Sequence, residues 1–97
     1  MLSDENSGRR ANLSFHDLSN QELSDLNLSV IGFFSASLQH AMLAGSNFTR
    51  ATMFGTDLRV ANLRRADMTR CDLRGACMRG ADLSDAIMVQ ADMREGS

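Results

Sequence analysis

The residues able to do chemistry are few and scattered. His16 and His40 are the only histidines, and no carboxylate stands at a spacing that would orient either imidazole as a general base. Cys71 and Cys77 are the only cysteines, too few for a disulfide scaffold, and no histidine joins them in a metal-ligand pattern. The sequence therefore predicts no catalytic residue, no metal site, no cofactor and no enzymatic activity.

Length and charge narrow the class of protein further. The chain has 97 residues and a formal net charge of −2, which excludes both a polycation that coats nucleic acid and an acidic tail. Hydrophobic residues make up 43% of it, enough for one domain with a modest core. No apolar run reaches the roughly 18 residues of a membrane helix, and the start of the chain lacks the basic and apolar regions of a signal peptide. We expect one cytoplasmic domain that does not contact membranes.

A large apolar residue recurs at every fifth position, which we call the central position. The seventeen central residues, which form the predicted core, are Leu13, Leu18, Leu23, Leu28, Phe33, Leu38, Leu43, Phe48, Met53, Leu58, Leu63, Met68, Leu73, Met78, Leu83, Met88 and Met93. Ten of the eleven alanines stand two residues before a central position, and Asp or Asn stands directly before it ten times. A period of five fits neither a helix nor a strand. A coil that turns a corner every five residues would bring the central and the small residue inward, with Asp, Asn and Gly at the corners.

The repeated unit Ala-(Asp/Asn)-Leu-X-X, seen at residues 61–65 and 81–85, resembles the pentapeptide-repeat family over residues 11–95. The resemblance implies an all-β fold, a right-handed quadrilateral parallel β-helix, in which four pentapeptides make one coil and seventeen repeats make about four coils. Residues 1–10 are predicted to be a polar leader or partial N-terminal cap, and residues 96–97 a tail. No capping element follows residue 95, so either this end stacks on another molecule or the chain is a piece of a longer one.

The first repeats depart from the pattern, because larger residues stand where alanine is usual. These residues are His16, Gln21, Leu26 and Ile31. We expect a wider or less regular first coil, with His16 facing inward and His40 at an outward corner. The same reasoning places Cys71 in the core as a small apolar residue and Cys77 on the surface.

With twenty residues per coil, residues twenty apart should stack in columns. Phe34 and Phe54 are then predicted to point outward, one above the other, in a column that continues to Arg74 and Arg94. Exposed stacked aromatic rings are typical of a contact site. The alternative is that the rings only stabilise the coil stack, as cross-strand aromatic pairs stabilise sheets, and both can hold together.

Arginine columns form the second surface pattern. Arg59 should stack on Arg79, and seven arginines against three aspartates give residues 50–79 a net charge of +4, whereas residues 1–49 carry −3. One interpretation is a basic patch for an anionic partner. The favoured alternative is a solvated face on which arginine alternates with aspartate, as in Asp57 beside Arg59. No aromatic residue interleaves with these arginines, which argues against nucleic acid as a partner.

Two hypotheses about function follow. The favoured one is a rigid, non-enzymatic protein-interaction module or spacer, whose candidate surface comprises Phe34, Phe54, Arg59, Arg79, Arg74 and Arg94. Its partner is an unidentified protein or a second copy, bound end to end or through the Phe34/Phe54 patch. The alternative is a DNA-mimicking inhibitor or protector of a type II topoisomerase (gyrase), since the quinolone-resistance members of the family resemble the duplex in shape and negative charge. This chain departs from that group by its arginines and by its lack of a recognisable C-terminal helix.

Overall fold

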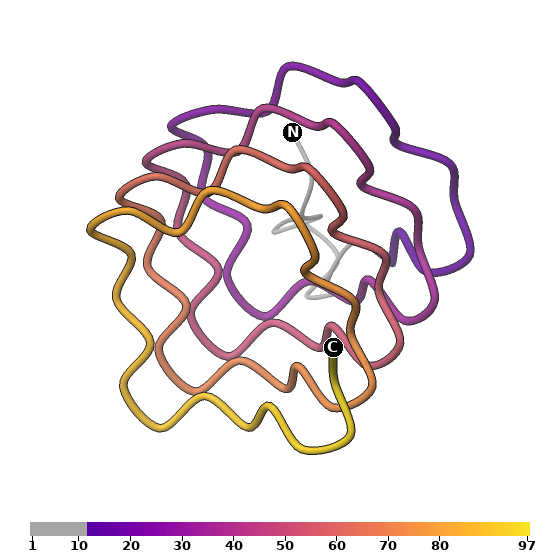
Figure 1. Ribbon diagram of the computed structural model, residues 1–97, viewed down its shortest axis with the longest axis vertical. Coiled ribbons are helices and arrows are strands. Elements are labelled where there is room, and N and C mark those ends of the chain that lie inside the picture. The colour runs from indigo at the N-terminus through magenta and orange to yellow at the C-terminus, as the bar shows by residue number, and fades with distance from the viewer. Residues whose placement is uncertain (1–11) are drawn as a thin grey trace, which may run out of the picture.

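The computed structural model describes residues 12–97, so the predicted leader at residues 1–10 lies outside the described part. The chain winds into stacked four-cornered coils, from the indigo coil at one end to the yellow coil at the other (Figure 1). Thirteen parallel bridges join each bridging residue to the residue twenty positions further on, from Asn12–Gly32 to Asp72–Asp92. These bridges confirm the predicted β-helix with four pentapeptides per coil. Within residues 12–97 the pairing consists of isolated bridges, with no helix and no longer strand.

Four walls surround the core, and each is identified by its column of bridging residues. Wall 1 carries Asn12, Gly32, Thr52, Asp72 and Asp92; wall 2 carries Asp17, Ser37, Asp57 and Cys77; wall 3 carries Glu22, Met42, Asn62 and Asp82; wall 4 carries Asn27, Asn47, Asp67 and Ile87. The residue after each central position projects from the same wall. Walls 1 and 3 are opposite sides of the coil stack.

The core is built from the central residues and the small residues two positions before them. The central side chains from Leu28 to Leu73 are buried, together with the alanines two positions before central residues in this range. Those of the first and last coils, such as Leu13 and Leu83, are only partly buried and pack against this cluster. Met93 departs from the expectation, because it is 47% exposed at the end of the stack, where it has neighbours on one side only.

Backbone hydrogen bonds explain why each repeat position prefers its residue type. The central N–H donates to the next coil, as in Phe33 N to the Thr52 carbonyl at 2.7 Å, and the turn closes within the repeat, as in Ala36 N to the Phe33 carbonyl at 3.0 Å. The N–H after the central residue has no such partner. The preceding Asp or Asn side chain accepts it, as Asp67 Oδ1 does for Thr69 N at 3.0 Å. This local bond accounts for the Asp and Asn residues before the central position.

Polar residues in the small inner positions are satisfied by the preceding coil. Ser46 Oγ donates to the Leu23 carbonyl at 2.6 Å, Thr56 Oγ1 to the Phe33 carbonyl at 2.6 Å, and Cys71 Sγ to the Phe48 carbonyl at 2.8 Å. Among residues 12–97 no buried side-chain nitrogen or oxygen lacks a partner. Serine, threonine and cysteine can therefore replace alanine without an uncompensated polar group in the core.

The first coil differs from the expectation at His16. Its side chain is exposed rather than inward, and its Nδ1 lies 2.9 Å from the Ser14 carbonyl oxygen. Gln21 and Leu26 are exposed as well, whereas Ile31 is buried. A bulky polar ring in the inner position would lose its hydration without a buried partner, so facing outward is favourable for it. In the predicted tail, Ser97 N donates to the Ala76 carbonyl at 3.0 Å, as the backbone of the preceding coils does.

Every corner uses a left-handed backbone conformation. The residue two positions after each central residue has φ between 54° and 74°. Glycine occupies only four of these seventeen corners, and the other thirteen hold residues with side chains, including His40. The hydrogen-bonded turn therefore imposes positive φ whatever the side chain is, at a cost of about 1–2 kcal/mol for an L-residue.

The valine at one corner offers a test of this strain. Val60 has φ 59° and is 50% exposed, so Val60→Gly should remove the strain of a β-branched residue while losing little packing. After subtracting the entropic disadvantage of glycine, about 0.5–1 kcal/mol, we expect the free energy of unfolding to rise by up to about 1 kcal/mol in urea titration. Val89→Gly is the matched control, because Val89 is 58% exposed and is not at a corner. Equal destabilisation by both changes would contradict the corner argument.

Candidate interaction surface

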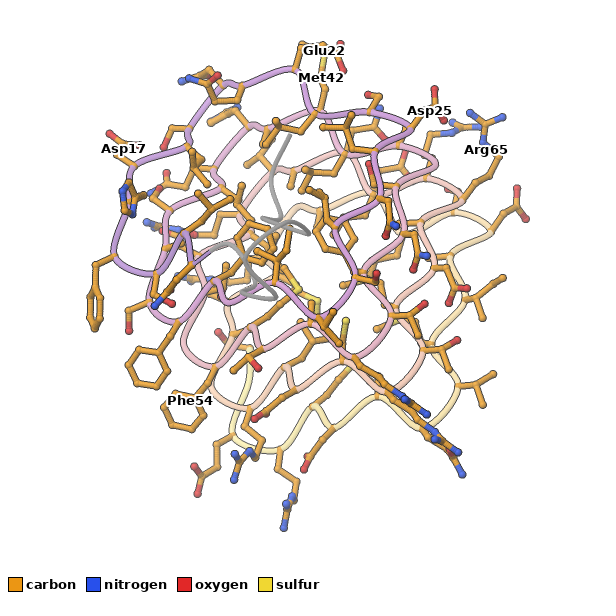
Figure 2. All side chains as sticks on the ribbon, turned by 180° about the vertical axis from the view of Figure 1, so that it is seen from behind. Asp17, Glu22, Asp25, Met42, Phe54 and Arg65 are labelled. Carbon is orange, nitrogen blue, oxygen red and sulfur yellow. The ribbon has the colours of Figure 1, made fainter. Side chains whose placement is uncertain are left out.

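Aromatic side chains stack along wall 1 and point outward. The rings of Phe34 and Phe54 are nearly parallel, with centroids 5.2 Å apart and an interplanar angle of 9°. Phe15 adds a third ring, tilted by 57° with its centroid 5.6 Å from that of Phe34. Figure 2 shows Phe54 projecting away from the coils, on a different side from Met42. We call Phe15, Phe34 and Phe54 the aromatic ladder.

Phe15 was not singled out by the sequence pattern. It occupies the corner position of its repeat, with φ 63°, whereas Phe34 and Phe54 follow central residues. The left-handed corner turns its side chain toward the same wall, where it is 75% exposed. The available signal was its separation of nineteen residues from Phe34, one short of a full coil.

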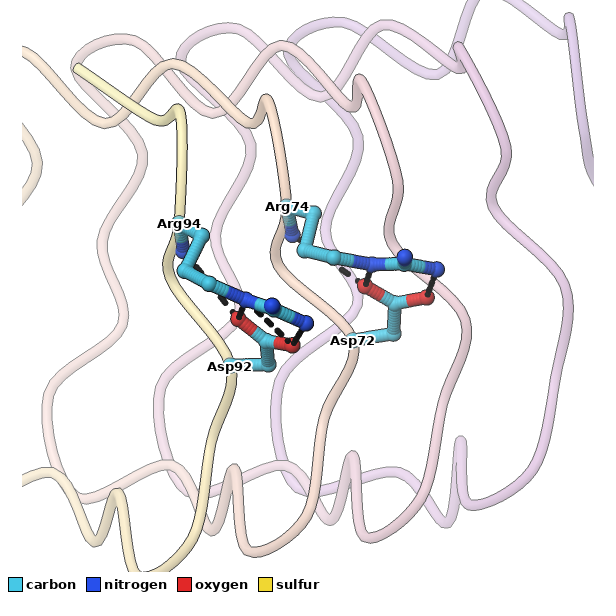
Figure 3. Close-up of polar contacts among 4 residues, drawn as sticks. All are labelled: Asp72, Arg74, Asp92 and Arg94. Carbon is cyan, nitrogen blue, oxygen red and sulfur yellow. Dashed lines mark hydrogen bonds and ion pairs between the residues drawn. The ribbon is translucent and has the colours of Figure 1, made fainter.

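Ion pairs continue the ladder on wall 1. The Arg74 guanidinium lies over the Phe54 ring, with Cζ 5.3 Å from the ring centroid. It also binds Asp72 through Nε and Nη2, both at 2.8 Å, and Arg94 binds Asp92 one coil further on, with Nη2 to Oδ2 at 2.7 Å (Figure 3). A cation over an exposed ring contributes about 0.5–1 kcal/mol, so Arg74 is held in place from two directions.

These ion pairs lower the pKa of the aspartates. The Arg74 side chain hydrogen bond is the largest cause of the lowered pKa of Asp72, and the corresponding bond from Arg94 lowers the pKa of Asp92 from 3.8 to about 2. Because the pKa of each aspartate is lower in the folded than in the unfolded protein, its negative charge stabilises the folded state. This stabilisation is present above about pH 4 and is lost as the pH falls through the folded-state pKa.

We therefore expect the free energy of unfolding to decrease as the pH falls from about 4 to about 2. Asp72→Asn should reduce this decrease, because the amide keeps an oxygen that can accept the Arg74 N–H but has no charge to lose. Urea titrations at several pH values measure the effect, and high salt should weaken it, since the pair is partly exposed. A pH dependence identical in wild type and Asp72→Asn would contradict the assignment.

Small residues flank the aromatic ladder on both sides. Gly32 and Thr52 lie before the rings along the chain, and the corner column beside them holds Ser35, Gly55 and Gly75 between Phe15 and Glu95 at its ends. A Cβ added at Gly75 would meet only the backbone of Gly55, at 3.8 Å or more. The rings therefore form a ridge beside a column that has little side-chain bulk.

The six residues expected to form one surface lie on two adjacent walls. Wall 1 carries Phe34, Phe54, Arg74 and Arg94, and wall 2 carries Arg59 and Arg79. Their separation follows from the repeat, because residues five positions apart belong to successive walls.

Aspartates neutralise part of the predicted basic patch. Arg59 Nη2 lies 2.7 Å from Asp57 Oδ2, and the hydrogen bond of Arg59 is the largest cause of the lowered pKa of Asp57. Arg64 Nη1 lies 3.7 Å from Asp82 Oδ2. The structure thus shows the alternation of arginine with aspartate that the sequence suggested.

Neither cysteine lies in a metal or disulfide site. Both thiols are free, and burial, the largest cause, raises the pKa of Cys71 to about 12. Cys77 is half-buried rather than fully exposed, and hydrogen bonds to Ser97 and then to Arg79 lower its pKa to about 7. In the described part of the chain no group of three or more His, Cys, Asp or Glu side chains could hold a metal ion. Nor does any helix there have the length and hydropathy needed to cross a membrane.

The chain belongs to the pentapeptide-repeat family. The family model for pentapeptide repeats matches residues 33–70 and 55–85, with eight copies of the repeat. This match agrees with the coils and bridges described above. A search of curated proteins gave no significant match.

Solved structures share the fold over almost the whole chain. Trypsin-treated QnrB1, described as a plasmid-mediated fluoroquinolone resistance protein, is similar with a TM-score of 0.75 and 22% identity over 98% of this chain and 51% of that one. HetL, a pentapeptide repeat protein involved in heterocyst differentiation regulation from the cyanobacterium Nostoc, is 30% identical over 94% of this chain and 44% of that one, with a TM-score of 0.51. The chain spans about half the length of these proteins. The likeness to QnrB1 concerns the fold alone.

Proposed function

We propose that this protein is a rigid, non-enzymatic protein-interaction module, and that the aromatic ladder with Arg74 is its contact surface. The observation that carries the proposal is the outward stacking of Phe34 on Phe54 with Arg74 over the second ring. Phenylalanine and arginine are enriched in protein interfaces, and arginine also among the residues that dominate binding energy. A row of such side chains on one flat wall offers a partner an apolar strip with a charged end.

Rigidity makes this surface suited to binding. Each ring of the aromatic ladder is attached to backbone that is hydrogen-bonded to neighbouring coils. For example, Ser35 N donates to the Phe54 carbonyl at 3.0 Å. Phe34 N also donates to Ser14 Oγ at 2.8 Å. Because the rings already contact one another, binding would order few additional rotamers and lose little conformational entropy.

The double variant Phe34→Ser/Phe54→Ser tests this function. Cross-linking in the cells that make the protein, followed by mass spectrometry, should recover partner chains with wild type and not with the double variant. Met42→Ser is the matched control, because Met42 is 43% exposed on wall 3 and should leave partner recovery unchanged. Recovery of the same partners by all three proteins would contradict a contact surface on wall 1.

The fold shared with QnrB1 favours a second candidate, the imitation of DNA in a type II topoisomerase (gyrase). Surface charge argues against it. Residues 12–49 carry three acidic groups and no arginine, but residues 50–79 carry seven arginines against three aspartates, so a positive belt interrupts the negative surface that such imitation needs. A supercoiling assay distinguishes the two candidates, because inhibition of gyrase by low micromolar protein is expected only for the DNA mimic.

A further inference from the structure

We propose that wall 1 binds wall 1 of a second copy of this chain, with the two coil stacks antiparallel and a two-fold axis passing between Phe34 and Phe54. This inference rests on the proposed function and names the partner of that surface. In this arrangement Phe34 faces the partner's Phe54, and Phe15 faces the partner's Arg74. Four observations support a second copy of the chain as the occupant.

The first observation is the shape of the wall. The stacked rings of Phe34 and Phe54 form a ridge, and Ser35, Gly55 and Gly75 form a column of low bulk beside it. Under the two-fold axis that makes the stacks antiparallel, the ridge of each copy faces the ridge of the other, and the columns of low bulk face one another beside the rings. An isologous contact of this kind needs only one self-complementary surface.

The second observation is the spacing of the rungs. Four successive coils carry Phe15, Phe34, Phe54 and Arg74. The bridges hold neighbouring coils at the spacing of paired strands, about 4.8 Å. A partner that meets every rung needs side chains with the same repeat. A second copy of this chain has that repeat, whereas a helix, which rises about 5.4 Å per turn, falls out of register.

The third observation is the distribution of charge on wall 1. Among residues 12–97 the charged side chains that face outward on wall 1 are Asp72, Arg74, Asp92 and Arg94, which form two ion pairs, and Glu95 lies at the corner beside Arg94. Two such walls can approach without net repulsion. A parallel arrangement would place Arg74 against the partner's Arg74, whereas the antiparallel one places an aromatic ring against each guanidinium.

The fourth observation is the exposure of Phe15. It is 75% exposed, far more than the 39% of Phe34, because no further ring covers its outer side. The two-fold axis brings the partner's Arg74 to this most exposed ring of the aromatic ladder. The ring surface that residues 12–97 leave uncovered is thus covered by the second copy.

Phe15→Glu and Phe15→Arg test the arrangement as a matched pair. Both variants lose the ring at the same exposed corner, so they differ only in the charge presented to the partner's Arg74. Within one chain Arg74 lies three coils away, about 14 Å, beyond the screening length of about 8 Å at physiological salt. Urea titration verifies that both variants fold as wild type does.

Sedimentation velocity over concentrations from about 10 µM to about 1 mM is the measurement, since a contact of one small wall is expected to be weak. We expect wild type to dimerise, and Phe15→Arg to weaken the dimer at least tenfold more than Phe15→Glu, with the difference shrinking in high salt. Monomeric wild type over the whole range, or equal weakening by both variants, would overturn the antiparallel pairing. Recovery of other proteins through Phe34 and Phe54 would in that case leave the proposed function standing, because that test does not depend on self-association.

Discussion

Phe33→Ala is expected to reduce the free energy of unfolding by about 3–5 kcal/mol, whereas Phe34→Ala should reduce it by about 1 kcal/mol or less. The two residues are neighbours in the sequence and differ in the direction of their side chains. Phe33 is fully buried, with its ring edge-on to Phe48 at 5.9 Å between centroids, and Phe34 is 39% exposed on wall 1. Removing the inner ring leaves a cavity that a closed coil cannot easily fill, while removing the outer ring leaves water in its place.

Urea denaturation followed by circular dichroism measures both changes in the same buffer. If Phe33→Ala does not fold, Phe33→Leu provides a milder change at the same site, expected to cost more than Phe34→Leu. Similar losses of stability at the two positions would contradict the assignment of inner and outer side chains. The comparison also shows whether the aromatic ladder contributes mainly to binding or to stability.

Ala61→Leu should destabilise the protein by about 1–3 kcal/mol through overpacking. Ala61 is 1% exposed in the third coil, and the corresponding positions of the coils before and after it are Ala41 and Ala81. The backbone on either side of Ala61 is tied to the neighbouring coils, for example by Asn62 N donating to the Ala41 carbonyl at 3.0 Å. A larger side chain therefore cannot be accommodated without stretching these backbone hydrogen bonds between coils or displacing central residues.

Ala44→Leu is the control for this overpacking. Ala44 follows a central residue and lies half-buried on the outside of wall 3, so a longer side chain there extends along the surface. We expect a change in the free energy of unfolding within about 0.5 kcal/mol. Equal destabilisation by both leucines in thermal and urea unfolding would show that the inner position is not the constraint we describe.

The inner side of the coils was predictable from the sequence because one rule repeats without interruption. Burial of a large residue at Leu28 and of alanine at Ala36 depends only on position within the pentapeptide. Stacking of Phe34 on Phe54 followed from the same rule once twenty residues were assigned to a coil. An inward side chain meets the same surroundings in each coil, so a short pattern specifies it.

Features set by local backbone geometry or by the ends of the stack were less predictable. Asp, Asn and Gly were expected at the corners, although the turn imposes positive φ on valine and arginine as well, as at Val60. Phe15 joins the aromatic ladder only because its corner redirects the side chain. His16 and Met93 lie in the first and last coils of residues 12–97, which pack on one described coil only, and there the rule for inner positions weakens.

Hydroxyl-radical footprinting tests most directly whether wall 1 is the surface by which this protein is contacted. Side-chain oxidation at Phe34 and Phe54 would be compared between dilute purified protein and the cells that make it, with Met42 and Val60 on other sides of the stack as internal controls. We expect several-fold protection of the two phenylalanines in cells and no protection of the controls. Unprotected phenylalanines, or protection confined to Met42 or Val60, would contradict the account.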